Sequence, residues 1–245
     1  MGSVRMQRVC AWCGPAFVVV FFTGMLVAGF IPPKSPGDTP AQVAAFYREN
    51  TTAIRTGLLL MMVSAGFTIP FAAAISVQMR RAEGAFAPLA YTQLVGGAVG
   101  AVAILVPVLM FTAAAFRPGR SAEITQAIND LAMIPFVINF PPAVVQSLAI
   151  AGVALGAREG EGPVVFPRWV GWYNLLTVVG FLPAAFAVFN KKGPFAWNGL
   201  LSFWLAAVMF GGWFLIMSFV THQAITRQER EQEQSAREPL VAQPA

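Results

Sequence analysis

The chain has 245 residues, of which 57% are hydrophobic and only 11% are charged, and its formal net charge is +5. A typical soluble domain carries about 25% charged residues, so a soluble fold of this size would expose too much apolar surface. The basic residues are spread over the ends of apolar runs instead of forming one patch, which argues against a nucleic-acid-binding domain. The composition therefore predicts an integral membrane protein.

Six apolar runs fill most of the sequence. Each approaches or exceeds the ~20 residues that an α-helix needs to cross the ~30 Å hydrocarbon layer of a bilayer, and none alternates in the way of a membrane β-strand. We therefore predict an all-α integral membrane protein with six transmembrane helices, forming one domain over residues 1–225. The runs are Ala11–Ile31, Thr56–Ser76, Ala90–Phe111, Leu131–Val153, Val170–Phe189 and Gly199–Val220.

The first run also has features of a signal peptide, since Arg5 and Arg8 precede it. Its length of about 21 residues exceeds the 7–15 residues of a signal-peptide core, so we predict that this helix is retained. Six spans place both termini on one side of the membrane. Basic residues, including the pair Arg80-Arg81, are somewhat more numerous on the side of the N-terminus, and this bias predicts an N-in, C-in topology.

Two segments are predicted to lie outside the spans. The connection over residues 32–55 is assigned to the external side, and Thr39-Pro40 within it has the pattern of an N-cap followed by proline at the first helical position. Residues 41–50 then form a short amphipathic helix, which either lies at the membrane interface or packs against the bundle. Residues 226–245 are polar, and we predict a cytoplasmic tail that extends the sixth helix by about one or two turns and is then disordered.

An internal similarity relates the second run to the fifth. Residues 66–72 read GFTIPFA, and residues 180–186 read GFLPAAF. A repeat of three helices would give two halves of inverted topology, a common plan in transporters. Apolar runs also resemble each other through composition alone, so the 3+3 repeat is a weak pattern.

The fourth run holds most of the polar side chains that fall inside the spans. Asn139 and Gln146 are seven residues apart and share one face of an ideal helix, while Pro135, Pro141 and Pro142 interrupt that helix. A broken helix whose polar face lines a cavity or solute path is one interpretation. The other is a kinked helix in which Asn and Gln only join neighbouring helices, each hydrogen bond contributing ~0.6–2 kcal/mol.

The candidate intramembrane site consists of Asn129, Asp130, Asn139, Gln146 and Asn174. An ionisable group at membrane depth is costly and marks a functional site by default, which makes Asp130 a candidate. Alternatively, Asp130 lies in the first turn of its helix and complements the helix N-terminus, and this is the interpretation that we favour. Asn174 follows a Trp-rich segment at the start of its span, where a packing role is expected.

Two short motifs have weak specificity. Gly96 and Gly100 form a GxxxG pair on the third run, which permits close helix contact within the chain, with a second copy or with another membrane protein. Cys10 and Cys13 form a CxxC motif, for which a redox membrane protein is a distant hypothesis. Without a second CxxC or a thioredoxin-like βαβ pattern, chance pairing of the two cysteines is the favoured explanation.

The residue types that are missing exclude several chemistries. His222 is the only histidine, which argues against histidine-based metal, haem or di-iron sites. The sequence contains no phosphate-binding loop and no GxSxG nucleophile motif, and carboxylates are too scarce inside the spans for an acid–base pair. We therefore predict a non-enzymatic protein without a metal site or cofactor, which interacts with the lipid bilayer and not with nucleic acid.

Four short stretches resemble a family of six-helix bacterial inner-membrane proteins of unknown function. They are residues 44–51 (AAFYRENT), 129–132 (NDLA), 166–169 (FPRW) and 193–199 (GPFAWNG). The similarity covers nearly the whole chain except the tail. It implies a multi-pass protein of the bacterial inner (cytoplasmic) membrane, and it implies no particular activity.

Two functional hypotheses follow from these patterns. The first is an accessory or lipid-binding subunit of a larger assembly, because helix packing explains most polar residues in the spans. The second is a small-solute transporter or channel that uses the kinked, polar fourth helix. A cavity reaching Asn139 and Gln146 would favour transport, and a closed, dry bundle would exclude it.

Overall fold

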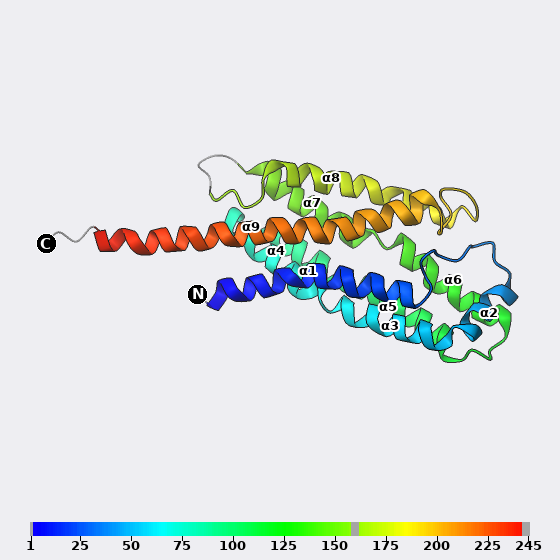
Figure 1. Ribbon diagram of the computed structural model, residues 1–245. Helices are drawn as coiled ribbons and strands as arrows, with labels where there is room; N and C mark the ends of the chain where they lie inside the picture. Colours follow the sequence, from blue (N-terminus) through cyan, green and yellow to red (C-terminus); the bar gives the residue numbers. More distant parts are fainter. Residues whose placement is uncertain (1, 158–161, 242–245) are drawn as a thin grey trace.

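The computed structural model describes residues 2–157 and 162–241. In this part of the chain every regular element is a helix, and six segments are long and apolar enough to cross a membrane, which confirms the predicted all-α membrane fold. The first span begins and the sixth span ends at the same end of the bundle (Figure 1), and the side of the membrane that this end faces stays a prediction. The six segments are Val4–Val27, Thr51–Glu83, Pro88–Phe116, Ala122–Gly156, Arg168–Val188 and Leu200–Ser235.

Only the first and third spans are single α-helices, namely α1 (Gly2–Val27) and α5 (Pro88–Phe116). In each of the other four spans the helix is either interrupted or changes its type along its length. The second consists of α3 (Thr51–Ala65) and α4 (Thr68–Glu83), the fourth of α6 (Ala122–Ile138) and α7 (Pro141–Gly156), the fifth of α8 (Arg168–Phe181) and the 3₁₀ helix η1 (Leu182–Val188), and the sixth of the π-helical turn η2 (Leu200–Trp204) and α9 (Leu205–Val241).

Proline and asparagine explain the interruption of the fourth span. α7 begins with Pro141, which has no N–H to donate to the preceding turn. Asn139 leaves the α-helical region, with φ −81° and ψ 42°, and its amide donates a hydrogen bond to the carbonyl oxygen of Ala103 in α5. Pro135 lies inside α6 without ending it. The predicted kink in the fourth helix is therefore a break at residues 139–140.

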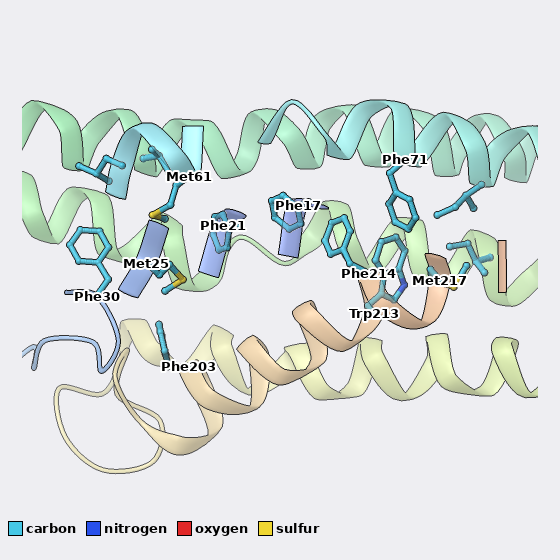
Figure 2. Packing of buried hydrophobic residues seen from close by; sticks show 14 of the residues in the cluster. Phe17, Phe21, Met25, Phe30, Met61, Phe71, Phe203, Trp213, Phe214 and Met217 are labelled. Carbon is cyan, nitrogen blue, oxygen red and sulfur yellow. The ribbon is translucent and has the colours of Figure 1, made fainter. Parts of the chain in front are cut away.

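The core of the bundle surrounds α1, which contacts α3, α4 and α9 (Figure 2). The ring of Phe17 in α1 lies 4.4 Å from that of Phe214 in α9, and Phe214 lies 5.4 Å from Phe71 in α4, measured between centroids. Where α1 crosses α3, a Cβ atom on Gly24 would lie 2.6 Å from the carbonyl oxygen of Gly57. Glycine therefore lets these two backbones approach closely, as is common between membrane helices.

Charged side chains meet both ends of α5. At its start, the Glu83 carboxylate accepts hydrogen bonds from the backbone N–H groups of Leu89 (3.1 Å) and Ala90 (2.7 Å). At its end, the Arg55 guanidinium donates to the carbonyl oxygens of Ala115 (3.0 Å) and Phe116 (2.9 Å). Each charge complements the partial charge of the helix terminus that it contacts, so both connections of α5 are held in place.

The helix predicted in the long connection is α2 (Pro40–Glu49), with Thr39 as its N-cap and Pro40 at its first position. Its apolar side buries Val43 and Tyr47, chiefly against α6. Of the two arrangements that the sequence left open, the structure therefore has the helix packed against the bundle.

A cluster of polar side chains joins α1, α4 and α9 at the end of the bundle that holds the termini. Gln78 of α4 is fully buried, and its Nε2 atom donates to the side-chain oxygens of Gln7 (2.6 Å) and Gln228 (2.7 Å). Its Oε1 atom accepts a hydrogen bond from Arg81 (2.8 Å). These four residues, Gln7, Gln78, Arg81 and Gln228, form what we call the glutamine cluster.

The sixth span continues beyond the predicted end of the membrane domain. α9 runs to Val241 and extends past the neighbouring helices (Figure 1). Beyond residue 226, Glu229 pairs with Arg8 (2.7 Å) and Glu231 pairs with Arg81 (2.5 Å). Polar contacts with α1 and α4 thus hold the one or two turns by which the sixth helix was predicted to extend. The disorder expected after them stays a prediction, and residues 242–245 lie outside the described part.

Candidate functional site

The five predicted site residues do not form one site. Asn129 and Asp130 lie in α6, Asn139 and Gln146 lie at and beyond the break of the fourth span, and Asn174 lies in α8. The structure divides them into three groups with different partners. Two of these groups join helices to one another, and the third borders a cavity.

Asn129 joins α6 to α2. The Tyr47 hydroxyl donates to Asn129 Oδ1 (3.0 Å), and Asn129 Nδ2 donates to the Asp130 carboxylate (3.4 Å). Burial raises the pKa of Tyr47, and the nearby charge of Asp130 raises it further. The favoured placement of Asp130 in a first helical turn is wrong, because α6 extends outward along α2 and begins at Ala122, about two turns earlier. Glu123 is the acidic residue of that first turn.

Asn174 joins α8 to α9. Its side chain is fully buried, its Nδ2 atom donates to the carbonyl oxygen of Val170 (2.9 Å), and its Oδ1 atom accepts from the indole N–H of Trp213 (2.9 Å). The donor thus bonds within α8, and the acceptor joins α8 to α9. These contacts give Asn174 a packing role, and it does not line the cavity.

Asn139 and Gln146 border a cavity between two halves of the molecule, the first half being spans one to three and the second spans four to six. Its larger part, which we call the aromatic lobe, has a volume of about 120 Å³. Figure 2 shows Phe21 and Met25 of α1 and Phe203 of η2, which line this lobe from the two halves. Seven phenylalanine side chains contribute to its wall: Phe21, Phe22, Phe136, Phe140, Phe181, Phe203 and Phe210.

The smaller part, which we call the polar lobe, has a volume of about 60 Å³. The two lobes adjoin, because they share five lining residues: Ile104, Asn139, Ala143, Phe181 and Phe210. The polar lobe extends toward α4 and the middle of α7. The side chains that give it polar character are Thr68, Asn139, Gln146 and Ser147.

The polar groups around the cavity differ in how their hydrogen bonds are satisfied. Thr68, Asn139 and Ser202 all donate to backbone carbonyl groups. Gln146 is only 8% exposed and Ser147 only 1%, yet neither side chain has a hydrogen-bond partner among the residues that the structure describes. These two side chains are therefore available to bind a polar group inside the cavity.

The irregular parts of four spans meet at this cavity. Non-helical backbone at membrane depth is tolerated where it is buried in protein or lines a cavity. The lining residues at or next to these irregular parts are Thr68 in the second span, Asn139 in the fourth, Phe181 in the fifth, and Ser202 and Phe203 in the sixth. The breaks therefore shape one common site instead of four separate kinks.

Sequence reasoning identified Asn139 and Gln146 and missed most of the lining. Ser147 follows Gln146 directly among the polar residues of the fourth run, and the five predicted site residues did not include it. Ser202 lies in a π-helical turn, which has no distinctive sequence pattern. The phenylalanines are spread over several spans, and only the packing of those spans brings them together.

The chemistry of the lining is uncharged and hydrophobic. Among the described residues, no Asp, Glu, Lys, Arg or His lines either lobe, and no group of three His, Cys, Asp or Glu side chains is placed to hold a metal ion. Cys10 and Cys13 are free thiols in the first half of α1, and neither lines the cavity. The lining thus offers hydrophobic contacts and uncharged hydrogen-bonding groups to a bound molecule.

The two glycines of the GxxxG motif have different surroundings. Gly96 is covered by α7, because a Cβ atom there would lie 3.2 Å from Gln146 Cγ and 3.3 Å from the carbonyl oxygen of Pro142. Gly100 lines the polar lobe, and a Cβ atom there would meet nothing within 4 Å. Gly96 therefore serves packing within the chain, and Gly100 leaves space in the cavity.

No protein-family model, no curated protein and no solved structure matches this chain. Its function has therefore to be inferred from the geometry of the cavity.

Proposed function

We propose that this protein is a membrane carrier that binds a small solute in the cavity between its two halves. The main support is the convergence of four interrupted spans at one cavity. Secondary transporters place their substrate near the bilayer midplane, between halves and beside discontinuous helices. Asn139 fits this position, because α6 and α7 extend for 17 and 16 residues on its two sides.

The proposal includes an inverted 3+3 repeat with N-in, C-in topology in a bacterial inner membrane. In the second span, α3 ends immediately before Gly66-Phe67. In the fifth span, α8 gives way to a 3₁₀ helix immediately after Gly180-Phe181. The backbone thus changes at the same Gly-Phe pair in both spans, which supports a common origin of the two halves.

A lipid-binding accessory subunit is the second candidate, and the apolar lining of the aromatic lobe favours it. The polar side chains of that lobe are Asn139 and Ser202 only, and a lipid acyl chain needs no polar partner. The two candidates differ in access to water. A carrier must open its cavity to the aqueous phase, whereas a lipid-binding subunit need not.

Labelling of a single cysteine tests this difference. In a chain with Cys10→Ser and Cys13→Ser, Ala143→Cys places a thiol where the two lobes adjoin. Membrane vesicles are then treated on either side with a thiol reagent that cannot cross the bilayer. We expect Ala143→Cys to react from at least one side, because a carrier opens its cavity to water.

Val208→Cys in the same background is the matched control. Val208 is 67% exposed on the outer surface of α9, in the middle of an apolar segment, so its thiol is expected to face hydrocarbon and to stay unlabelled. If folded Ala143→Cys protein reacts from neither side, carrier function is excluded and the lipid-binding subunit becomes the better interpretation.

A further inference from the structure

We propose that the two-lobed cavity selects an uncharged amphipathic molecule. A hydrocarbon body the size of one ring would occupy the aromatic lobe, and one hydrogen-bonding group would occupy the polar lobe. This inference rests on the proposed carrier function and names the class of its substrate.

The aromatic lobe sets the size and nature of the hydrocarbon body. An apolar protein cavity of about 150 Å³ binds benzene, and the aromatic lobe is slightly smaller at about 120 Å³. Phe21, Phe136, Phe203 and Phe210 reach it from four different helical segments. A ring placed among them contacts both faces and edges of phenyl groups, the arrangements that aromatic pairs prefer.

The lining also requires that the molecule carries no net charge. Among the described residues, neither lobe has a charged side chain to pair with an ion. Removing an ion from water without such a partner costs many kcal/mol, so ionic molecules are excluded. Asp130, the ionisable residue of the predicted site, lines neither lobe.

The polar lobe sets the position of the hydrogen-bonding group. A glutamine amide and a serine hydroxyl can each donate and accept, and Gln146 and Ser147 are buried there without partners among the described residues. A Cβ atom on Gly97 would lie 2.9 Å from Gln146 Nε2, so the glycine provides the room that this amide occupies. A hydroxyl or amide group on the ligand would satisfy these side chains, and a site that pairs such a group discriminates strongly against analogues that lack it.

Three probes with the same ring separate these requirements: benzyl alcohol, toluene and benzoate. Thermal unfolding of the full chain in detergent is followed by the fluorescence of its six tryptophans, because a ligand that binds only the folded state raises the midpoint. We expect benzyl alcohol to raise the midpoint at roughly tenfold lower concentration than toluene, the ratio for one net hydrogen bond. Benzoate is expected to have no effect. A benzoate response equal to that of benzyl alcohol would overturn the proposal.

Variants separate binding in the cavity from partition into the micelle. Ala143→Phe fills the point where the lobes adjoin and is expected to abolish the responses to benzyl alcohol and to toluene. If this variant does not fold, Ala207→Phe in the wall of the aromatic lobe replaces it. Gln146→Leu is expected to remove the preference for benzyl alcohol over toluene while keeping the response to toluene. Equal responses of the filled and wild-type chains would overturn the proposal.

Three further outcomes separate this proposal from the carrier function and from lipid binding. Labelling of Ala143→Cys from water without any response to benzyl alcohol would keep the carrier and overturn this substrate class. A response to benzyl alcohol without labelling would keep the ligand class and exclude the carrier. Loss of a co-purifying lipid from Ala143→Phe, together with no response of the wild type to benzyl alcohol, would identify an acyl chain as the occupant and overturn the proposal.

Discussion

Gln78 and Gln146 are the same residue type, and both are buried inside the bundle, but their surroundings differ. Gln78 is 0% exposed and forms hydrogen bonds with Gln7, Gln228 and Arg81. Gln146 is 8% exposed and forms none with the described residues. Residue type and burial therefore do not distinguish a residue that joins helices from one that lines a binding site. What differs between these two glutamines is whether their hydrogen bonds are satisfied by other described residues.

Two glycines give a similar contrast, because one contacts the backbone of another helix and the other faces open space. Their substitution is expected to have the largest effect on stability. A Cβ atom on Gly57 would meet backbone atoms of Gly24 and Ala28, so Gly57→Ala must push α1 away from α3. We expect a loss of about 3 kcal/mol in the free energy of unfolding. The matched Gly100→Ala adds a methyl group where nothing lies within 4 Å, and it should be neutral or up to about 1 kcal/mol stabilising. Unfolding in mixed detergent micelles measures both, and equal losses would contradict the contrast.

Removal of the two glutamine amides tests the contrast directly. Gln78→Leu leaves the side chains of Gln7, Gln228 and Arg81 without this partner, and we expect it to cost about 2 kcal/mol. Gln146→Leu removes no hydrogen bond within the described part and should change the free energy of unfolding by less than about 0.5 kcal/mol. The same micelle titration measures both variants. If Gln146→Leu lowered the free energy of unfolding more than Gln78→Leu, Gln146 and not Gln78 would be the residue that joins helices.

Much of the fold follows from the sequence, because length and hydropathy decide whether a helix spans a bilayer. The break at residues 139–140 also follows, from the proline at 141. The grouping of the polar residues does not follow. Asn129 pairs with Tyr47, 82 positions away, and Asn174 pairs with Trp213, 39 positions away. Such partners are set by helix packing, so no local pattern reveals which polar residues are already satisfied.

Tyr47 extends the comparison to the opposite end of the bundle. Tyr47→Phe removes the hydrogen bond to Asn129, and we expect it to lower the free energy of unfolding by about 1 kcal/mol at neutral pH. Tyr91→Phe is the control, because that ring is 49% exposed, and it should cost less. Burial raises the pKa of Tyr47 above its ordinary value of 10.0, so above that pH the unfolded chain releases the proton first. This contribution to stability is present below pH 10 and is lost as pH rises further. Unfolding measured from pH 8 to 11 should show the loss in wild type and a smaller one in Tyr47→Phe.

The smallest effect is expected at the edge of the glutamine cluster. The ion pair between Arg8 and Glu229 joins side chains that are 37% and 45% exposed, and water screens such pairs. Glu229→Gln should therefore cost about 0.5 kcal/mol or less, and the cost should vanish at high salt. A loss above about 1 kcal/mol would show that the ion pair belongs energetically to the buried cluster.

The carboxylate of Glu83 has a consequence for the order in which the chain assembles. Its hydrogen bonds to Leu89 and Ala90 span only six and seven positions, and closing so short a loop costs little entropy. We therefore expect the second and third spans to pair as a hairpin during synthesis, which would set the α5 wall of the cavity in place before spans four to six emerge. We expect Glu83→Ala to lower the yield of membrane-inserted protein more than the unfolding midpoint of the folded protein. If the yield of inserted protein and the unfolding midpoint fell by the same fraction, this carboxylate would act only on the finished structure.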